Sequence, residues 1–297
     1  MISGHDPQSG AKPALAMDQQ NNNLARRAAS TLVLAPVAVA AAGLGGWVFV
    51  VTCAVAAGLV LWEWTLLVAR RADLRILIPG FAALLAAALL TGLGQPAAAI
   101  AALVIGALIA SGVIAALPRA DREETAPGWA ATGVIYAGIA FIGPAGLRGD
   151  PEKGFAALLF LFATVWATDI LAYLVGRSLG GPPLWPELSP KKTWAGAIGG
   201  LCGGVIAGAL VAYATAGTKP VVAGVLALVL SIAAQGGDLF ESWVKRRFGA
   251  KDAGALIPGH GGMMDRIDGF LAAALLALVL GSLRLGIAAS ARGLLVW

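Results

Sequence analysis

The chain has 297 residues, of which 59% are hydrophobic and 12% are charged, and its formal net charge is +5. Soluble domains carry roughly twice that share of charged residues, so the composition excludes an ordinary soluble protein. Uncharged apolar runs recur from residue 28 onward. They predict an all-α, polytopic integral membrane bundle rather than the short alternating segments of a membrane β-barrel. The excess of positive charge is typical of loops that orient a membrane protein, so we expect a lipid bilayer and no nucleic acid as partner.

The first 27 residues are polar and include the run Gln-Gln-Asn-Asn-Asn. This composition predicts a disordered cytoplasmic tail over residues 1–27. The tail lacks the apolar core of a cleavable signal peptide. We therefore expect the first hydrophobic segment, which follows Arg26 and Arg27, to act as an uncleaved signal anchor.

At about 20 residues per span, the rest of the chain divides into about nine hydrophobic segments. They cover residues 29–43, 46–69, 76–93, 96–117, 128–146, 154–177, 194–216, 220–245 and 266–289. Gly43, Gly45 and Gly46 predict a tight turn between the first two segments. We expect N-terminal transmembrane helices over residues 28–150 and a C-terminal transmembrane catalytic region over residues 151–297.

The basic residues predict the orientation of these segments. With the N-terminus in the cytoplasm, all but five of the 21 Lys and Arg residues fall on the cytoplasmic side. The five on the opposite side are Arg148, Lys153, Lys219, Arg284 and Arg292. This bias follows the positive-inside rule, and it places the polar connection after Asp238 at the cytoplasmic face of a cell membrane.

A polar stripe lies at the end of the eighth segment. Its members, which share one face of a helix, are Asp238, Glu241, Ser242 and Lys245. The plain alternative is a helix that leaves the membrane with a solvated stripe and a snorkelling Lys245. That alternative does not account for Asp238, which lies two turns deeper, where a carboxylate costs about 2.5–3.5 kcal/mol on insertion scales. The depth of Asp238 therefore predicts that a cationic side chain or a metal ion lies beside its carboxylate.

The connection after this segment is rich in glycine and charge. Lys251 and Asp252 precede the run Ile-Pro-Gly-His-Gly-Gly. Proline and glycine prevent a regular helix and let backbone N–H groups approach an anion. His260, Gly261 and Gly262 are therefore candidates for phosphate binding, although a histidine in such a loop is commonly just exposed.

Two carboxylates open the last hydrophobic segment. Asp265 and Asp268 are three residues apart and lie on one face of the first helical turn. Acidic residues there also complement the helix dipole, which is the plain alternative. If the last two segments are neighbours, Asp238 converges with both, and three hard oxygen ligands suit Mg²⁺. Arg266 and Lys245 are then candidates to neutralise phosphate oxygens, and a second metal ion is left open.

A second polar cluster lies upstream. Asp169 stands in the middle of an apolar segment, where an ionisable residue indicates a function. The next segment is preceded by a run that predicts a phosphate clamp, although lysines at a membrane interface also serve as lipid-facing anchors. The run comprises Ser189, Lys191, Lys192 and Thr193. Glu63 lies between two tryptophans of an interfacial belt, and the sequence does not assign it a catalytic role.

The stretch from Ser242 to Asp268 resembles the signature of the phosphatidate cytidylyltransferases, also called CDP-diacylglycerol synthases. The matching positions are Ser242, Val244, Lys245, Arg246, Lys251, Asp252, His260, Gly261, Gly262, Asp265, Arg266 and Asp268. The upstream positions that also look like this family are Thr168, Asp169, Gly176, Arg177 and the run from Ser189 to Trp194. The resemblance covers about residues 160–270. This family usually has Glu where the chain has Ala195, so the role of that Glu is missing here or supplied elsewhere.

The resemblance implies transfer of CMP from CTP to phosphatidic acid at the cytoplasmic face of the cell membrane, with Mg²⁺ as cofactor. The catalytic residues are then Asp238, Lys245, Asp265, Arg266 and Asp268, with Asp238, Asp265 and Asp268 as metal ligands. The substrate-binding residues are Asp169, Ser189, Lys191, Lys192, Thr193, Glu241, Ser242, Arg246, Lys251, Asp252, His260, Gly261 and Gly262. A homodimer is left open.

Other functions compete with this one. A CDP-alcohol phosphotransferase would need an Ala-Arg pair, a glycine and two further aspartates at short fixed intervals after Asp268-Gly269, and this pattern does not follow there. A CTP-dependent lipid or prenol kinase would instead transfer the γ-phosphoryl group and release CDP. An ion-coupled transporter would use Asp169 and Asp238 as ion sites, but it does not explain the dense polar motif in a loop.

Overall fold

The computed structural model describes residues 34–118, 126–254 and 262–297. Within these ranges, eight apolar helices are long enough to cross a bilayer. They are α2 (Gly46–Ala69), α3 (Leu74–Gly92), α4 (Pro96–Ala116), α5 (Pro127–Arg148), α6 (Gly154–Leu179), α7 (Trp194–Ala216), α8 (Pro220–Arg247) and α9 (Met264–Leu285). The predicted all-α membrane bundle is confirmed, and the chain is a multi-pass membrane protein.

The first of the nine predicted segments differs from the prediction. Residues 29–33 lie outside the described part of the chain, and the remainder forms the short apolar helix Leu34–Leu44. A helix of that length rises about 16 Å, roughly half the thickness of the hydrocarbon core. Among the described residues, eight long helices therefore stand where about nine were predicted.

The predicted turn after this short helix is confirmed. Gly45 and Gly46 have φ angles of 64° and 51°, a left-handed conformation that glycine adopts without a steric penalty. Arg148 at the end of α5 closes the turn, since its Nε donates to the carbonyl oxygen of Ala42 at 2.5 Å. A Cβ at Gly45 would overlap this guanidinium, so a side chain there would also force Arg148 to move.

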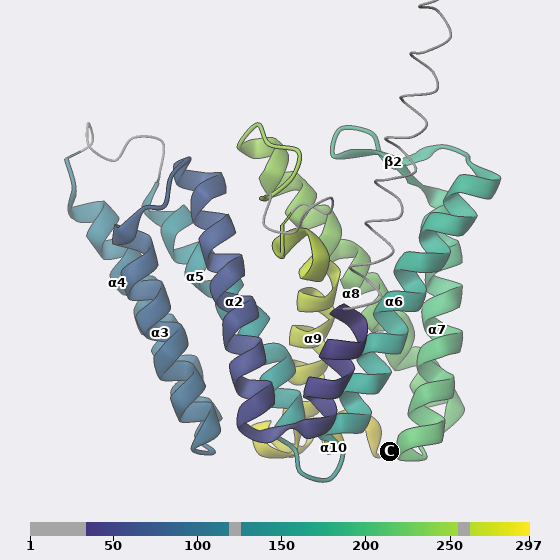
Figure 1. The fold of residues 1–297 in the computed structure, drawn as a ribbon. Helices are drawn as coiled ribbons and strands as arrows, with labels where there is room; N and C mark the ends of the chain where they lie inside the picture. Colours follow the sequence, from purple (N-terminus) through teal and green to yellow (C-terminus); the bar gives the residue numbers. More distant parts are fainter. Residues whose placement is uncertain (1–33, 119–125, 255–261) are drawn as a thin grey trace, which may run out of the picture.

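The helices follow one another across the bundle in a simple order (Figure 1). α3 and α4 pack together on one side, α2 and α5 come next, α9 and α8 lie in the centre, and α6 and α7 form the other side. α9 is central, because it contacts α5, α6 and α8. The C-terminal ends of α2, α6 and α8 lie at the same end of the bundle. The polar segments that follow these helices therefore lie at one end of the molecule.

Small residues let α7 lie close to α6 and α8. A Cβ at Gly204 would lie 2.3 Å from Thr168 Oγ1 and 3.0 Å from Ser231 Oγ. Within this contact the hydroxyls of Thr168 and Ser231 share a hydrogen bond of 2.7 Å. In a membrane, such close approach supplies the van der Waals attraction that drives helices together. The packing of these three helices fixes α6 beside α8.

The run before α7 forms a strand, which was not predicted from the sequence. β1 (Pro183–Trp185) pairs antiparallel with β2 (Ser189–Thr193). The paired positions are Pro183 with Thr193 and Trp185 with Ser189. A residue that precedes proline favours an extended backbone, and Ser189 precedes Pro190. Thr193 then caps α7, since its Oγ1 accepts from the N–H of Gly196 at 3.1 Å.

The last hydrophobic segment ends earlier than predicted. α9 stops at Leu285, and the chain continues through the 3-10 helix η2 (Ile287–Ala289) and the short helix α10 (Ser290–Leu295), which packs against α9. Asp150 holds α10 in place, because this buried carboxylate accepts from the backbone N–H of Arg292 at 2.8 Å.

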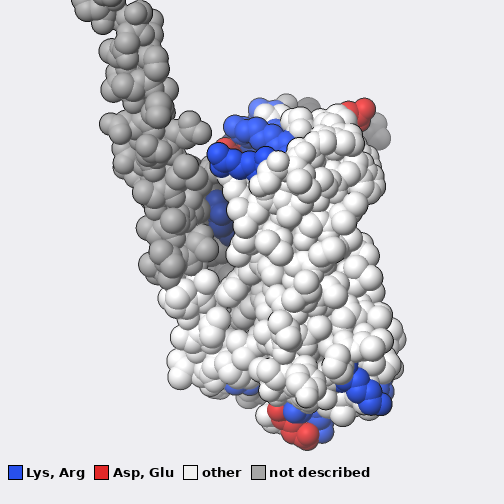
Figure 2. All heavy atoms as spheres, turned by 90° about the vertical axis from the view of Figure 1, so that its right-hand side faces the viewer, with Lys and Arg blue, Asp and Glu red and all other residues white. Residues whose placement is uncertain are grey.

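Charged side chains gather at the two ends of the molecule. Figure 2 shows basic side chains with some acidic ones at both ends of the visible face, and a largely uncharged surface between them. An uncharged band of this kind is what the hydrocarbon core of a bilayer requires.

Candidate active site

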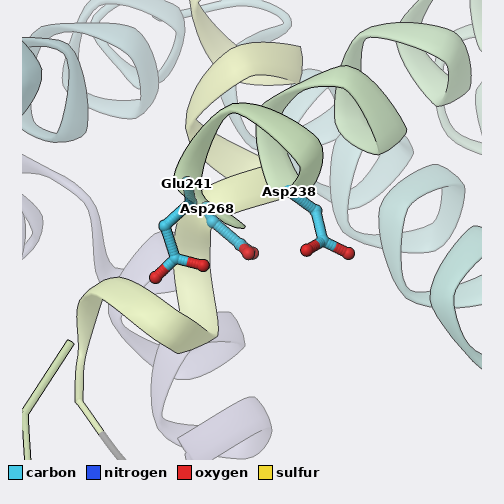
Figure 3. Close-up of side chains that lie close together, drawn as sticks. All are labelled: Asp238, Glu241 and Asp268. Carbon is cyan, nitrogen blue, oxygen red and sulfur yellow. The ribbon is translucent and has the colours of Figure 1, made fainter. Parts of the chain in front are cut away.

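Carboxylates from two helices meet toward the end of the bundle that carries the β-hairpin. Asp238 and Glu241 lie one turn apart on α8, and Asp268 lies near the start of α9. One carboxylate oxygen of each lies within 4.8 Å of the others, and Figure 3 shows the three side chains close together. Glu241 is buried, whereas Asp238 and Asp268 are half-buried, so the group remains accessible.

Two glycines explain why α8 and α9 bring these side chains together. A Cβ at Gly237 would lie 2.7 Å from the carbonyl oxygen of Asp268, and one at Gly269 would lie 2.9 Å from the carbonyl oxygen of Ala234. Each glycine is the direct chain neighbour of an acidic residue in the group. The absence of a side chain at these two positions lets the backbones touch where the carboxylates must converge.

Lys245 joins α8 to α9 beside this group. Its ammonium nitrogen lies 2.8 Å from Glu241 Oε2 and 2.6 Å from Asp265 Oδ1. The other oxygen of Asp265 accepts from the backbone N–H groups of Ala253 at 3.0 Å and Gly262 at 2.8 Å. Both oxygens of Asp265 are therefore engaged by neighbouring groups of the protein.

The structure brings together part of the metal-ligand set expected from the sequence. Asp238 and Asp268 meet as predicted, and Glu241 completes the group. Asp265 points instead to Lys245 and two backbone N–H groups. Its assignment as a metal ligand stays a prediction.

The β-hairpin reaches the acidic group from the side of α6. Lys192 on β2 forms an ion pair with Asp238. Asp169 on α6 is exposed and lies within electrostatic range of both residues. The remaining residues of the predicted clamp on the same strand are Ser189, Lys191 and Thr193. The two polar clusters identified in the sequence therefore adjoin each other through Lys192.

The donor set of the acidic group fits a divalent cation. All three side chains offer carboxylate oxygens, which are the ligands that Mg²⁺ prefers. Glu241 Oε1 is buried and has no hydrogen-bond partner among the described residues, and leaving such an oxygen unpaired is unfavourable. Lys192 and Lys245 offset part of the negative charge, so a bound cation would complete the balance.

Aromatic side chains lie beside the site on the side of α5. The ring of Tyr136 lies 5.2 Å from Trp64 and 5.9 Å from Phe240, between ring centroids. Its hydroxyl is buried without a hydrogen-bond partner among the described residues, and the carboxylates of Asp268 and Glu241 lie within electrostatic range. The sequence contained no signal for this residue, because a tyrosine in an apolar segment is ordinary.

Glu63 contributes to the site in a way that the sequence did not reveal. This side chain of α2 is fully buried and accepts hydrogen bonds from the backbone N–H groups of Met263 at 2.8 Å and Met264 at 2.7 Å. It therefore caps the start of α9. An available signal was the presence of a carboxylate within an apolar membrane segment.

The other predicted site residues lie around this centre. Ser242 is half-buried on α8, and Arg246 uses Nη1 to donate to a backbone carbonyl just past the end of that helix. The exposed residues of the set are Lys251, Asp252 and Arg266. His260 and Gly261 lie outside the described residues, so their roles stay predictions.

The sequence pattern of the Cytidylyltransferase family matches residues 25–283. The chain therefore belongs to this family and is a nucleotidyltransferase. Among its relatives, the phosphatidate cytidylyltransferase of Brucella abortus biovar 1 (strain 9-941) is 44% identical over 263 residues, which are 88% of this chain and 94% of the relative. The phosphatidate cytidylyltransferase of Staphylococcus haemolyticus (strain JCSC1435) is 41% identical over 139 residues, which are 46% of this chain and 52% of the relative. The family inferred from the sequence is confirmed.

Replacing Lys245 by methionine is expected to destabilise the protein strongly. The side chains of Glu241 and Asp265 are only 1% and 11% exposed, and removing one partner of a buried ion pair costs about 3–5 kcal/mol. Lys192→Met provides the matched control, because Lys192 and Asp238 are both about one-third exposed. Thermal denaturation of the purified variants should show a much larger fall in apparent Tm for Lys245→Met. Equal shifts would contradict the structural role of Lys245.

Proposed function

We propose that this chain transfers CMP from CTP to phosphatidic acid and forms CDP-diacylglycerol and pyrophosphate, a step of phospholipid biosynthesis. Relatives that align with nearly the whole chain carry the name of this activity. The observation that supports it most is the meeting of Asp238, Glu241 and Asp268 beside Lys192 and Lys245, at one end of an apolar bundle. A nucleotide from water and a lipid headgroup from the bilayer can both reach such a position.

The two lysines have different parts in this proposal. Lys192 lies on the hairpin, is 30% exposed and pairs with Asp238, so its ammonium is free to turn toward a phosphate oxygen when the nucleotide binds. Lys245 is held by Glu241 and Asp265, which fixes its charge in place. A fixed positive charge stabilises negative charge that develops on phosphate oxygens during the transfer.

The acidic group is the proposed Mg²⁺ site. Asp238 and Asp268 would hold the ion together with Glu241, and Asp265 is retained as a candidate ligand one turn away. When bound, Mg²⁺ supplies positive charge to the triphosphate and orients it. The unpartnered oxygen of Glu241 supports this assignment.

The bond changes follow from the two substrates. A phosphate oxygen of phosphatidic acid forms a bond to the α-phosphorus of CTP, and the bond between that phosphorus and the oxygen bridging to the β-phosphate breaks. The electron pair leaves with pyrophosphate. A phosphate monoester is largely ionised near neutral pH, so the attack needs no strong general base. The protein contributes mainly by positioning the reactants and by balancing charge.

The orientation of the bundle is part of the proposal. The connections after α2, α6 and α8 lie at the end that carries the acidic group. Most Lys and Arg residues lie in these connections, in the helix turns that adjoin them, or in the N-terminal tail. Under the positive-inside rule this end faces the cytoplasm, where CTP is available. We therefore place the N-terminus and the site at the cytoplasmic face of the cell membrane.

Labelled nucleotides should separate this activity from its competitors. The purified protein in mixed micelles of detergent and phosphatidic acid is expected to transfer label to lipid from α-labelled CTP but not from γ-labelled CTP, and to release pyrophosphate. Chelation should stop the reaction and added Mg²⁺ should restore it. Label transferred from the γ-position, with CDP as product, would instead identify a lipid kinase. Absence of transfer from either nucleotide would contradict the proposed activity and leave an ion-coupled transporter as the alternative.

Isosteric removal of one negative charge from the site should abolish turnover. We expect Asp238→Asn and Asp268→Asn to lower kcat/KM by at least about 10²-fold, the scale for loss of one transition-state contact. Asp265→Asn should lose activity as well and should also lower the apparent Tm, because it weakens the pairing with Lys245. Glu152→Gln, at the opposite end of the bundle and 61% exposed, is the control. Wild-type-like turnover of Asp268→Asn would refute the proposed metal site.

Cysteine labelling tests the orientation. The two native cysteines, Cys53 and Cys202, are first replaced by serine, and single cysteines are introduced as Lys251→Cys or Glu152→Cys, at opposite ends of the bundle. On intact cells, a membrane-impermeant maleimide should label the Glu152→Cys protein, and it should label the Lys251→Cys protein only after permeabilisation. The reverse pattern would place the site on the outer face.

A further inference from the structure

The N-terminal part of the bundle reaches into the site through one buried side chain. Glu63 of α2 is fully buried, yet both of its carboxylate oxygens have a partner. Oε1 accepts from the N–H of Met263 at 2.8 Å, and Oε2 accepts from the N–H of Met264 at 2.7 Å. These contacts join residues 200 and 201 positions apart in the chain.

The first N–H groups of any helix have no partner within the helix. At the start of α9, Met263 has no side-chain cap of its own, so the carboxylate of Glu63 takes that place. A negative charge also interacts favourably with the positive end of a helix dipole. Glu63 thus satisfies in one contact both the hydrogen-bonding and the electrostatic demand of the α9 terminus.

Gly254 and Gly262, the described residues on either side of positions 255–261 between α8 and α9, both lie against the same carboxylate. A Cβ at Gly254 would lie 3.0 Å from Glu63 Oε1, and a Cβ at Gly262 would lie 2.5 Å from Glu63 Oε2. These two glycines belong to opposite ends of the connection. Both described ends therefore lie against Glu63: a Cβ at Gly262 would overlap the carboxylate, and a Cβ at Gly254 would press on it.

Asp265 holds the same two ends from the other side. Its Oδ2 accepts from the N–H of Ala253 and from the N–H of Gly262, while its Oδ1 binds Lys245. The described ends of the connection are therefore held between two carboxylates, one from α2 and one from α9. A shift of Met264 would move Asp265, which is the next residue.

We infer that Glu63 is a positioning residue that clamps the described ends of the α8–α9 connection and thereby fixes Asp265 and Asp268 relative to α8. The structural part of this inference is independent of the reaction, whereas its consequence for metal and nucleotide binding rests on the proposed function. In this clamp each oxygen of the carboxylate accepts from one N–H group, so both sides of the side chain must be acceptors. An amide at this position would present a donor to one of the two N–H groups.

Hydrogen exchange at two amides tests the clamp without any substrate. In Glu63→Gln, exchange at Met263 and Met264 should accelerate by at least about tenfold, because a charge-assisted hydrogen bond is lost. Thr65→Val is the matched control on the same helix, since the Thr65 hydroxyl binds the carbonyl of Leu61 within α2. This control should leave both amides protected. Unchanged exchange in Glu63→Gln would overturn the inference.

A variant that keeps the carboxylate covers the case in which loss of the carboxylate unfolds the protein, and a double-mutant cycle tests the clamp further when the protein folds without it. Gly254→Ala places a methyl group against Glu63 Oε1, and it should accelerate exchange at Met263 and Met264 by itself. In a Glu63→Ala background the methyl group meets no carboxylate, so adding Gly254→Ala should change exchange little further. Additive effects would show that the glycine and Glu63 act independently, and the clamp would be rejected.

The consequence for binding has a separate readout. Glu63→Gln should raise the Mg²⁺ concentration for half-maximal activity and the KM for CTP several-fold, with a smaller change in kcat, because the ligands are displaced rather than removed. Faster exchange with unchanged Mg²⁺ and CTP dependence would confine Glu63 to a structural role. If the wild-type protein transferred no CMP, the proposed function would fail while the exchange experiments still decided the clamp.

Discussion

The close contact between α8 and α9 is the constraint on which the site depends. Gly237 and Gly269 let the two backbones touch beside Asp238 and Asp268, and this contact draws negative charges from two helices to within 4.8 Å of one another, with Glu241 included. Such a concentration of like charge at the end of an apolar bundle is unfavourable unless cations balance it. The ammonium groups of Lys192 and Lys245 offset part of this negative charge, and the proposed Mg²⁺ would offset more of it.

The carboxylates of the site divide into two kinds according to how their oxygens are satisfied. Glu63 and Asp265 accept hydrogen bonds from backbone N–H groups around the start of α9, and Asp265 also binds Lys245. These two hold the backbone. Glu241 keeps one buried oxygen without a partner among the described residues, and Asp238 and Asp268 remain accessible beside it. Glu241, Asp238 and Asp268 are therefore the carboxylates available to a cation. Glu63 and Asp265 fix the backbone at the start of α9 and so position Asp268.

Much of the fold followed from local composition. Eight apolar segments appear as eight long helices among the described residues, because hydrophobicity and length alone decide whether a segment spans a bilayer. The expected turn at Gly45 and Gly46 appears because those residues accept a left-handed backbone. Local composition did not reveal the pairing of β1 with β2 or the return of α10 onto α9. Both depend on contacts with other parts of the chain.

The sequence by itself determined the class of protein, the positions of most spans, the family, and the charged residues of α8, α9 and the hairpin that lie around Asp238 and Asp268. These features are carried by composition and by short-range spacing. The tertiary structure alone decided that Glu241 joins the acidic pair while Asp265 turns to Lys245, that Lys192 reaches Asp238 from the hairpin, and that Glu63 caps α9. Each of these depends on which faces of separate helices meet, and that is set by side-chain packing between segments far apart along the chain.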